Sequence, residues 1–366
     1  GGTRLVLVNG RFEPGLSMTS GLPDGVRVTS LASVLAEGDR LRPYFSRDHA
    51  AYRDAFGALN TALFSDGACV ELAPDSTVRE PIEIVYLTDA SSGPILSSPR
   101  SLVLAGPKSA ATLVETHVGL TGQRYCTNGV TEVVLESGAH LAHYKIQDEA
   151  EDAFHLASLS VHQGEDSRYA SVHIALGSKI ARDEVRVALV GERAEVDLAG
   201  LYLPRQSQHH DHPILVEHAA PRTTSRQLYK GIADQHGHGV FNGHVVVRPG
   251  AIGTDAVQTN RNLLLSDTAE IDTRPRLEIF TDDVACAHGA AVGRLDEDAL
   301  FYLRSRGISE RDARGLLTYG FATEIVERVA PLAVRAWVDG LVAARLGADA
   351  AGCSLAKRER AIGSLP

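Results

Sequence analysis

A cysteine and a histidine stand two residues apart in the segment TDDVACAHGA (281–290), at Cys286 and His288. A thiolate and an imidazole suit soft or borderline metals such as iron and zinc, and a nearby histidine can lower the pKa of a thiol. Two ligands do not complete a tetrahedral metal site, so a partner chain would have to supply the others. The competing interpretation is a buried structural cysteine beside a histidine that hydrogen-bonds a neighbouring strand.

A second concentration of possible ligands lies between residues 209 and 244, which hold seven of the 15 histidines. His210 and His212 have the same parity, so on a strand both would point to one side at a spacing that a metal could bridge. The alternative is that the histidines of this region line turns and outward faces. The seven are His209, His210, His212, His218, His236, His238 and His244.

Other patterns exclude several classes of function. The chain has no G-x-x-x-x-G-K-[ST] phosphate loop, no G-x-S-x-G nucleophile turn and no H-E-x-x-H zinc motif. Its net charge of −10 argues against a nucleic-acid-binding surface. The sequence contains no run of about 18 apolar residues and therefore predicts no membrane helix. The four cysteines are far apart, which favours a reducing cytosol over a disulfide framework.

Three zones would have to position these residues. Residues 1–70 mix a short strand with a helix predicted to begin at Ser46, with Asp48 in its first turn. Residues 71–290 consist of short apolar or alternating runs separated by turn residues, without helical periodicity, which predicts strands almost throughout. Residues 291–366 are predicted to be helical, with Asp296 and Ser309 as N-caps.

The long strand zone allows two architectures. A single β-sandwich is too small for some 200 residues, so either a β-helix or two β-sandwiches would be needed, and the irregular spacing of the turns does not decide between them. If residues 281–290 form the last turn of a β-helix, the small Ala285 and Ala287 would suit a crowded interior. Cys286 and His288 would then face outward, towards solvent or a partner.

The segment DDVACAHGAAVGRLDEDALFYLRSRGI (282–308) resembles the SufB/SufD family of the SUF iron–sulfur cluster assembly system, and within it the SufD type. The similarity extends to SRQLYKGI (225–232), VFNGHVVV (240–247) and TNRNLLLSDTAEIDTRPRLEIF (259–280). It implies a mainly β protein, a right-handed parallel β-helix with an N-terminal mixed segment and a C-terminal helical region. The function implied is that of a non-catalytic scaffold subunit in the bacterial cytoplasm or the plastid stroma.

The resemblance also implies partners and ligands. A homologous SufB subunit would form a heterodimer with this chain and share a transient iron–sulfur cluster, with His288 as a ligand and Cys286 as the accompanying family cysteine. The SufC ATPase would hydrolyse ATP and dock on the C-terminal helices. Isolated chains could form homodimers, and the family's whole complex is associated with reduced flavin, for which no residues can be named. His210 and His212 take no role from the family. The expected docking residues are Leu303, Leu316, Tyr319, Phe321 and Ile325.

Two other functions are compatible with parts of the sequence. One is a stand-alone metal-binding or metal-sensing protein built on the histidine-rich segment. The other is a β-helix enzyme that acts on polysaccharides, but such sites need paired carboxylates or an aromatic groove. Aromatic residues make up 5% of this chain, with Trp337 as its single tryptophan.

Overall fold

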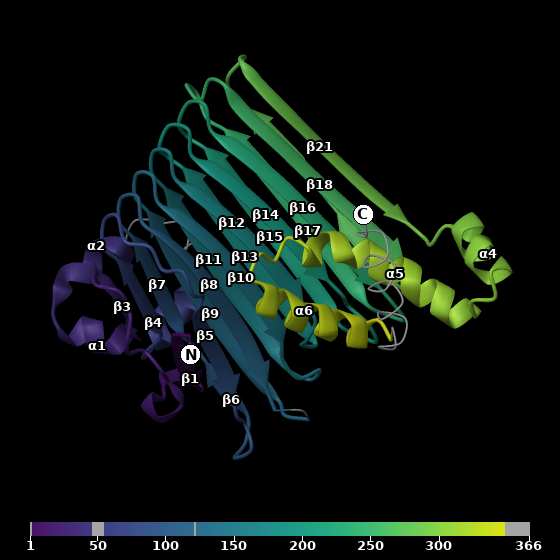
Figure 1. Ribbon diagram of the computed structural model, residues 1–366, viewed down its shortest axis with the longest axis horizontal. Coiled ribbons are helices and arrows are strands. Elements are labelled where there is room, and N and C mark those ends of the chain that lie inside the picture. The colour runs from purple at the N-terminus through teal and green to yellow at the C-terminus, as the bar shows by residue number, and fades with distance from the viewer. Residues whose placement is uncertain (1, 46–54, 121, 348–366) are drawn as a thin grey trace, which may run out of the picture.

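Strands that follow one another along the chain alternate between two facing sheets and wind into a parallel β-helix (Figure 1). This computed structural model describes residues 2–45, 55–120 and 122–347. Neighbouring strands of the helix body are parallel and in register. The predicted β-helix is therefore confirmed, and the alternative of two β-sandwiches is wrong.

Within each sheet the spatial order of the strands skips every second strand of the helix body, because the chain crosses to the other sheet in between. The ten-stranded sheet contains β2 (Arg11–Phe12), β1 (Arg4–Val8), β5 (Ile82–Thr88), β8 (Ala110–Gly119), β10 (His140–Asp148), β12 (Arg168–Ala175), β14 (Glu195–Tyr202), β16 (Thr224–Ala233), β18 (Thr254–Leu264) and β21 (Val284–Gly293). The eleven-stranded sheet contains β19 (Glu270–Thr273), β17 (His238–Val247), β15 (His209–His218), β13 (Ile180–Leu189), β11 (Phe154–Gln163), β9 (Tyr125–Leu135), β7 (Arg100–Ala105), β4 (Ala68–Leu72) and β3 (Val26–Ser30), with β20 (Arg276–Ile279) beside β17 and β6 (Ile95–Ser97) beside β9.

One corner of the β-helix repeats the same backbone device at turn after turn. A residue one or two places before each strand from β8 to β18 of the ten-stranded sheet has a positive φ, between 54° and 75°. Such a conformation reverses the chain in few residues but is unfavourable for most side chains. The residues concerned are Lys108, Gly138, Asp166, Arg193, Arg222 and Gly253.

The space between the sheets holds the main apolar core, whose larger members include the fully buried Tyr202 and Phe241. Aromatic side chains fit there because glycines lie beside them, in register on the neighbouring strand. A Cβ atom on Gly200 would lie 2.2 Å from the ring of Tyr229, and one on Gly231 would lie 2.4 Å from the ring of Tyr202. The two glycines therefore provide the room in which these rings pack.

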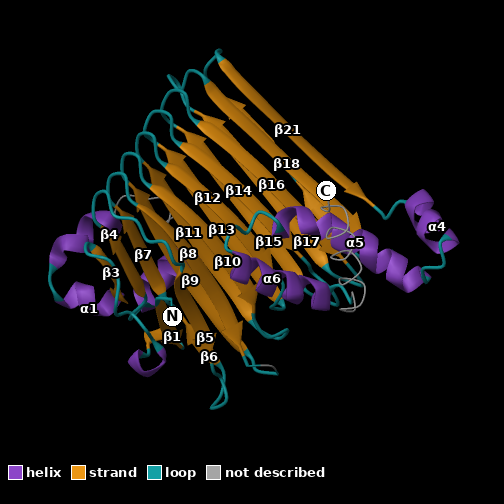
Figure 2. Cartoon of the chain, in the orientation of Figure 1, coloured by secondary structure: helices purple, strands orange, loops and turns teal. Residues whose placement is uncertain are grey.

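A second core lies outside the β-helix, where α5 (Glu310–Val326) and α6 (Leu332–Arg345) cover part of the ten-stranded sheet (Figure 2). Outward-facing Val172 and Ile174 of β12 pack there with Ile325 of α5 and Val338 and Val342 of α6. Both faces of these central strands are thus buried. Because the outward apolar side chains are buried by α5 and α6, the inner face of these strands can carry polar side chains.

The N-terminal segment adds strands to both sheets. β1 pairs in parallel with β5, and β3 pairs antiparallel with β4. The segment also contains η1 (Pro14–Leu16), α1 (Leu31–Ala36), η2 (Asp39–Leu41), α2 (Arg42–Phe45) and α3 (Ala55–Leu63). The predicted mixed character is confirmed, whereas Ser46 and Asp48, the predicted start of a helix, lie outside the described residues.

The predicted helix starts in the C-terminal segment are confirmed. Asp296 caps α4 (Glu297–Ser305) by accepting hydrogen bonds from the backbone of Asp298 and Ala299. The Ser309 hydroxyl accepts one from the backbone of Asp312 at the start of α5. No helix in the described ranges is long and apolar enough to cross a membrane.

Candidate functional site

The Cys286–His288 pair lies on β21, the strand that ends the ten-stranded sheet. The register places Cys286 beside Ala256 and His288 beside Gln258 on β18, and both of those residues are buried. Neighbours in register on parallel strands point to the same side. Cys286 and His288 therefore face the interior of the β-helix, at the end where its last turn is open.

This placement corrects the expectation that the pair faces outward. Ala285 and Ala287 are exposed, whereas Cys286 is half-buried and packs against the main core. The register with β18 determines which side chains of β21 point into the β-helix. The small size of the alanines does not place them inside. The pKa of the Cys286 thiol is raised by burial, so the expected lowering by His288 is also wrong.

His288 is exposed, although it shares its side of the strand with buried residues. It is the last member of a row of inward side chains that continues with Gln258 and Gln227, whose amide groups are hydrogen-bonded at 3.0 Å. An imidazole and a thiol thus lie on the same side of the strand at the rim of the β-helix. Two side chains of this kind do not by themselves complete a tetrahedral metal site.

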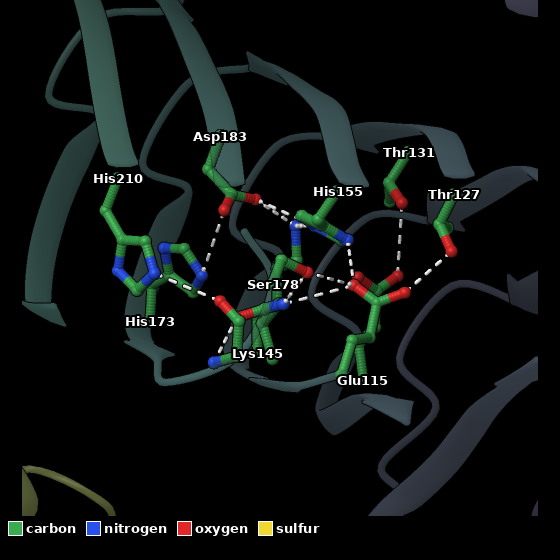
Figure 3. A network of polar contacts seen from close by, with 12 residues as sticks. Glu115, Thr127, Thr131, Lys145, His155, His173, Ser178, Asp183 and His210 are labelled. Carbon is green, nitrogen blue, oxygen red and sulfur yellow. Dashed lines mark hydrogen bonds and ion pairs between the residues drawn. The ribbon is translucent and has the colours of Figure 1, made fainter. Parts of the chain in front are cut away.

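Further inside, the β-helix contains a cluster of ionisable side chains that sequence patterns did not single out as a group (Figure 3). Its members come from neighbouring turns and from both sheets. Their burial requires that each charge have a partner, because an unpaired charge in such a place is very costly. The cluster comprises Glu115, His117, His143, Lys145, Glu149, His155, His173, Asp183, His210 and His212.

Two glutamates of the cluster are held ionised. Burial alone would raise the pKa of Glu115, but His143, 3.4 Å away, together with His117 and Lys145 outweighs burial, and the pKa falls to about 2. Burial likewise opposes ionisation of Glu149, yet His155 at 2.7 Å and the donated Thr127 hydroxyl at 2.6 Å bring its pKa to about 2. Both groups are therefore carboxylates at neutral pH.

Asp183 is the third carboxylate of the cluster. The Lys145 ammonium donates to its Oδ1, and His155 Nε2 lies 3.3 Å from the same oxygen. Burial works against the charge on Asp183, but His173, Lys145 and His155 keep the pKa of Asp183 well below the usual value. The pKa of His155 is raised, because Glu149 and Asp183 outweigh the lowering by burial and by Lys145.

Four other imidazoles of the cluster are held neutral. Burial lowers the pKa of His117, His173, His210 and His212 to about 3 in each case. His210 and His212 thus lie inside the β-helix, and the alternative that placed them on outward faces or turns is wrong. Their shared parity is confirmed, since both point inward from β15.

His210 and His212 nevertheless have different surroundings. His210 Nε2 is 3.0 Å from the carbonyl oxygen of Gly177, which occupies that nitrogen in a hydrogen bond. His212 instead lies with His173 and Asp183 in a group whose potential ligand atoms are all within 4.8 Å of one another. The structure therefore does not bring His210 and His212 together as one pair of ligands but places His212 with residues of two other strands.

The residues expected to contact an ATPase have mixed exposure. Ile325 is fully buried against the outer core, and the half-buried Phe321 packs against the same core and lies under Lys230. Leu303 is half-buried in a small core between α4 and α5. Leu316 and Tyr319 are half-buried, and the Tyr319 hydroxyl donates to Asp339 of α6.

Two of the most exposed large apolar side chains of this region lie on α4. The side chains of Phe301 and Tyr302 are 74% and 57% exposed. Two large aromatic side chains exposed side by side are typical of a surface that contacts another protein. Of the five expected docking residues only Leu303 belongs to α4, and the other four lie on α5.

Comparison with known proteins finds similarity along most of the chain. Residues 86–321 match the family model described as SUF system FeS cluster assembly, SufBD core domain, and residues 2–84 match that of the SufBD protein N-terminal region. An iron–sulfur cluster assembly SufBD family protein of Synechocystis sp. is 34% identical over 340 residues, which cover 90% of this chain and 75% of the relative.

Two further relatives come from other lineages. The iron–sulfur cluster assembly protein SufD of Escherichia coli is 32% identical over 331 residues, 88% of this chain and 74% of the relative. A protein of Arabidopsis thaliana whose name is chloroplastic ABCI7 is 33% identical over 337 residues, 89% of this chain and 70% of the relative. The similarity therefore covers both the β-helix and the N-terminal segment.

Proposed function

This chain belongs to the SufBD family of the SUF iron–sulfur cluster assembly system, and on that premise we propose that it is a SufD-type scaffold subunit. In this role it contributes His288 and Cys286 to a nascent-cluster site shared with a SufB-type subunit. It also docks a SufC-type ATPase, which supplies the ATP hydrolysis. The cluster is cargo that the complex builds and releases.

The observation that carries this proposal is the position of the two possible ligands on a terminal strand. β21 is the edge of a ten-stranded sheet, and most of its residues are exposed. An exposed edge strand with unpaired backbone groups invites pairing with another chain. A homologous β-helix that adds its own terminal strand would cover this edge and bring further ligands to His288 and Cys286.

The chemistry of the pair fits iron and sulfide cargo. Cys286 is protonated at neutral pH because burial raises its pKa, and metal binding would displace the proton. An incoming ferrous ion would thus meet the imidazole of His288 and a thiol that becomes a thiolate on binding. Cys69, Cys126 and Cys286 are free, which supports work in a reducing compartment such as the bacterial cytoplasm.

For the ATPase we propose docking on α4, centred on Phe301 and Tyr302, with the exposed parts of α5 around it. The fully buried Ile325 packs α5 against the ten-stranded sheet and is not a contact residue of this surface. α4 follows β21 after a short link, residues 294–296. Movement of a docked ATPase would therefore act close to the strand that carries the cluster ligands.

The ligand role is tested by co-expressing the chain with its SufB-type and SufC-type partners, as wild type and as His288→Ala. Iron and acid-labile sulfide are counted per intact complex. We expect the variant complex to assemble but to carry little cluster. His236→Ala, at an exposed histidine in a turn outside β21, is the matched control and should fill normally. A His288→Ala complex that fills like wild type would overturn the ligand role.

The docking surface is tested by affinity capture of the SufC-type ATPase with Phe301→Ala and, separately, Leu332→Ala. Leu332 is 76% exposed at the start of α6 and serves as an exposed apolar control away from α4. We expect the Phe301 variant alone to lose capture. Equal capture by the wild type and both variants would contradict docking through α4.

A further inference from the structure

We propose that His173, Asp183 and His212 bind one divalent transition-metal ion, zinc or ferrous iron, inside the β-helix. The site goes beyond the proposed function, since it uses neither Cys286 nor His288 and needs no partner chain. Its three residues belong to one molecule and are all buried: 5%, 3% and 2% of their surfaces are exposed.

The fold brings the three residues together from different strands. His173 points inward from β12 of the ten-stranded sheet, and Asp183 and His212 point inward from β13 and β15 of the eleven-stranded sheet. In the β13–β15 ladder, Arg182 pairs with Asp211, so the next position on each strand places Asp183 beside His212. A metal ion here would join the two sheets across the interior.

The ligand atoms have the spacing and the unused valences that a metal site needs. His173 Nε2 is 3.5 Å from Asp183 Oδ2, and atoms of all three residues lie within 4.8 Å of one another. Bonds of about 2.0–2.1 Å in a tetrahedral zinc site put adjacent ligand atoms roughly 3.3 Å apart. His173 Nε2, Asp183 Oδ2 and His212 Nε2 are buried without hydrogen-bond partners. Leaving such atoms unpaired is unfavourable, and a cation would engage all three.

The surrounding charges also favour a cation. Three carboxylates, Glu115, Glu149 and Asp183, share this interior with one lysine, Lys145. His143 lies against Glu115 and His155 lies against Glu149, so Asp183 is the carboxylate with an oxygen open to a metal ion. Lys145 donates to Oδ1 of Asp183, which leaves Oδ2, the oxygen nearest His173, for the metal (Figure 3).

A small cavity adjoins the group and provides space for a further ligand. Its volume is about 30 Å³, and its lining includes Lys145, His173, Asp183 and Tyr229. A cavity of this size can hold a water molecule or an ion. Three protein ligands and one water make a complete four-coordinate site.

The donor set selects the class of metal. Imidazole nitrogens suit zinc, iron, copper and nickel, whereas calcium and magnesium require oxygen ligands. Two histidines and one carboxylate are a known combination for zinc and for ferrous iron.

The test uses the purified full chain, stripped with a chelator and then titrated with Co²⁺ as a spectroscopic probe for this class of metal. Wild type should bind one ion per chain with a visible d–d spectrum that lacks thiolate charge-transfer bands. His173→Gln and His212→Gln should each lose this binding. His210→Gln is the matched control, because His210 is equally buried on the same strand but is engaged by Gly177, and it should bind like wild type.

Three results would overturn the proposal. The first is a stripped wild-type chain that binds no Co²⁺ or Zn²⁺. The second is binding that persists in folded His173→Gln and His212→Gln chains. The third is a thiolate charge-transfer band that disappears in Cys286→Ala, which would place the ion at β21. If a glutamine variant does not fold, as judged by circular dichroism, the wild-type spectrum alone separates nitrogen and oxygen ligands from thiolate.

Discussion

Replacing His117 by glutamine should make the free energy of unfolding markedly less sensitive to acid. His117 is buried between the sheets, where its ring stacks on that of Tyr86 at 4.3 Å with an interplanar angle of 4°. Burial, helped by the charge on Lys145, lowers the pKa of His117 from 6.5 to about 3. The folded chain therefore keeps this imidazole neutral at pH 5, whereas the unfolded chain protonates it.

The magnitude follows from proton linkage. Because the unfolded state binds more protons between pH 3 and pH 6.5, stability contributed by this group is present above pH 6.5 and is lost as the pH falls. From pH 6.5 to pH 5 the loss is about 1.5 times 1.36, or roughly 2 kcal/mol. Glu115 and Glu149 act in a lower window, from 4.5 down to about 2, and do not contribute at pH 5.

The assay is urea denaturation at pH 7 and pH 5, in the presence of a chelator and followed by circular dichroism. Between these two pH values the wild type should lose about 2 kcal/mol more than His117→Gln. Comparing the two pH values within each protein cancels the packing lost with the imidazole. His236→Gln, at an exposed turn position, should retain the full wild-type loss. An equal loss in the wild type and in His117→Gln would refute the buried neutral state of His117.

Three other changes test the packing and the edge. Gly200→Ala should lower the melting temperature in a thermal scan, because its Cβ would lie 2.2 Å from the ring of Tyr229; an unchanged value would contradict that contact. Lys230→Met should speed proteolysis of α5 and cost about 1–3 kcal/mol, since Lys230 donates to the Phe321 carbonyl at 2.9 Å and pairs with a carboxylate of α5. Ala291→Lys on β21 should reduce self-association of the isolated chain in light scattering, because a lysine protects an exposed edge, and an unaffected dimer would place the interface elsewhere.

The C-terminal helices show how far local sequence can predict structure. Asp296 and Ser309 are followed by the acidic first turns that cap a helix, and both begin helices as expected. Capping is decided within four residues, so no distant part of the chain is needed to predict it. The exposure of α4 was not predictable in this way, because it depends on what α5 and α6 cover.

The inner cluster shows where sequence patterns fail. In β12, Ser171 and His173 alternate with Val172 and Ile174, which identifies two faces but not which of them is inside. The valine and isoleucine face outward beneath α5 and α6, and the polar residues face inward. The sequence held one signal, since histidines and acidic residues recur at alternate positions on several consecutive strands. This signal becomes informative only when the register between the strands is known.

The sequence by itself determined the elements, the family resemblance and the Cys286–His288 spacing, since each is carried by contiguous residues. Only the tertiary structure decided what those elements enclose. Lys145 meets Asp183 across 38 positions of sequence, and His173 meets His212 between opposite sheets. Such contacts depend on the length of every intervening turn, and a shift of one residue in register would turn each side chain to the other face.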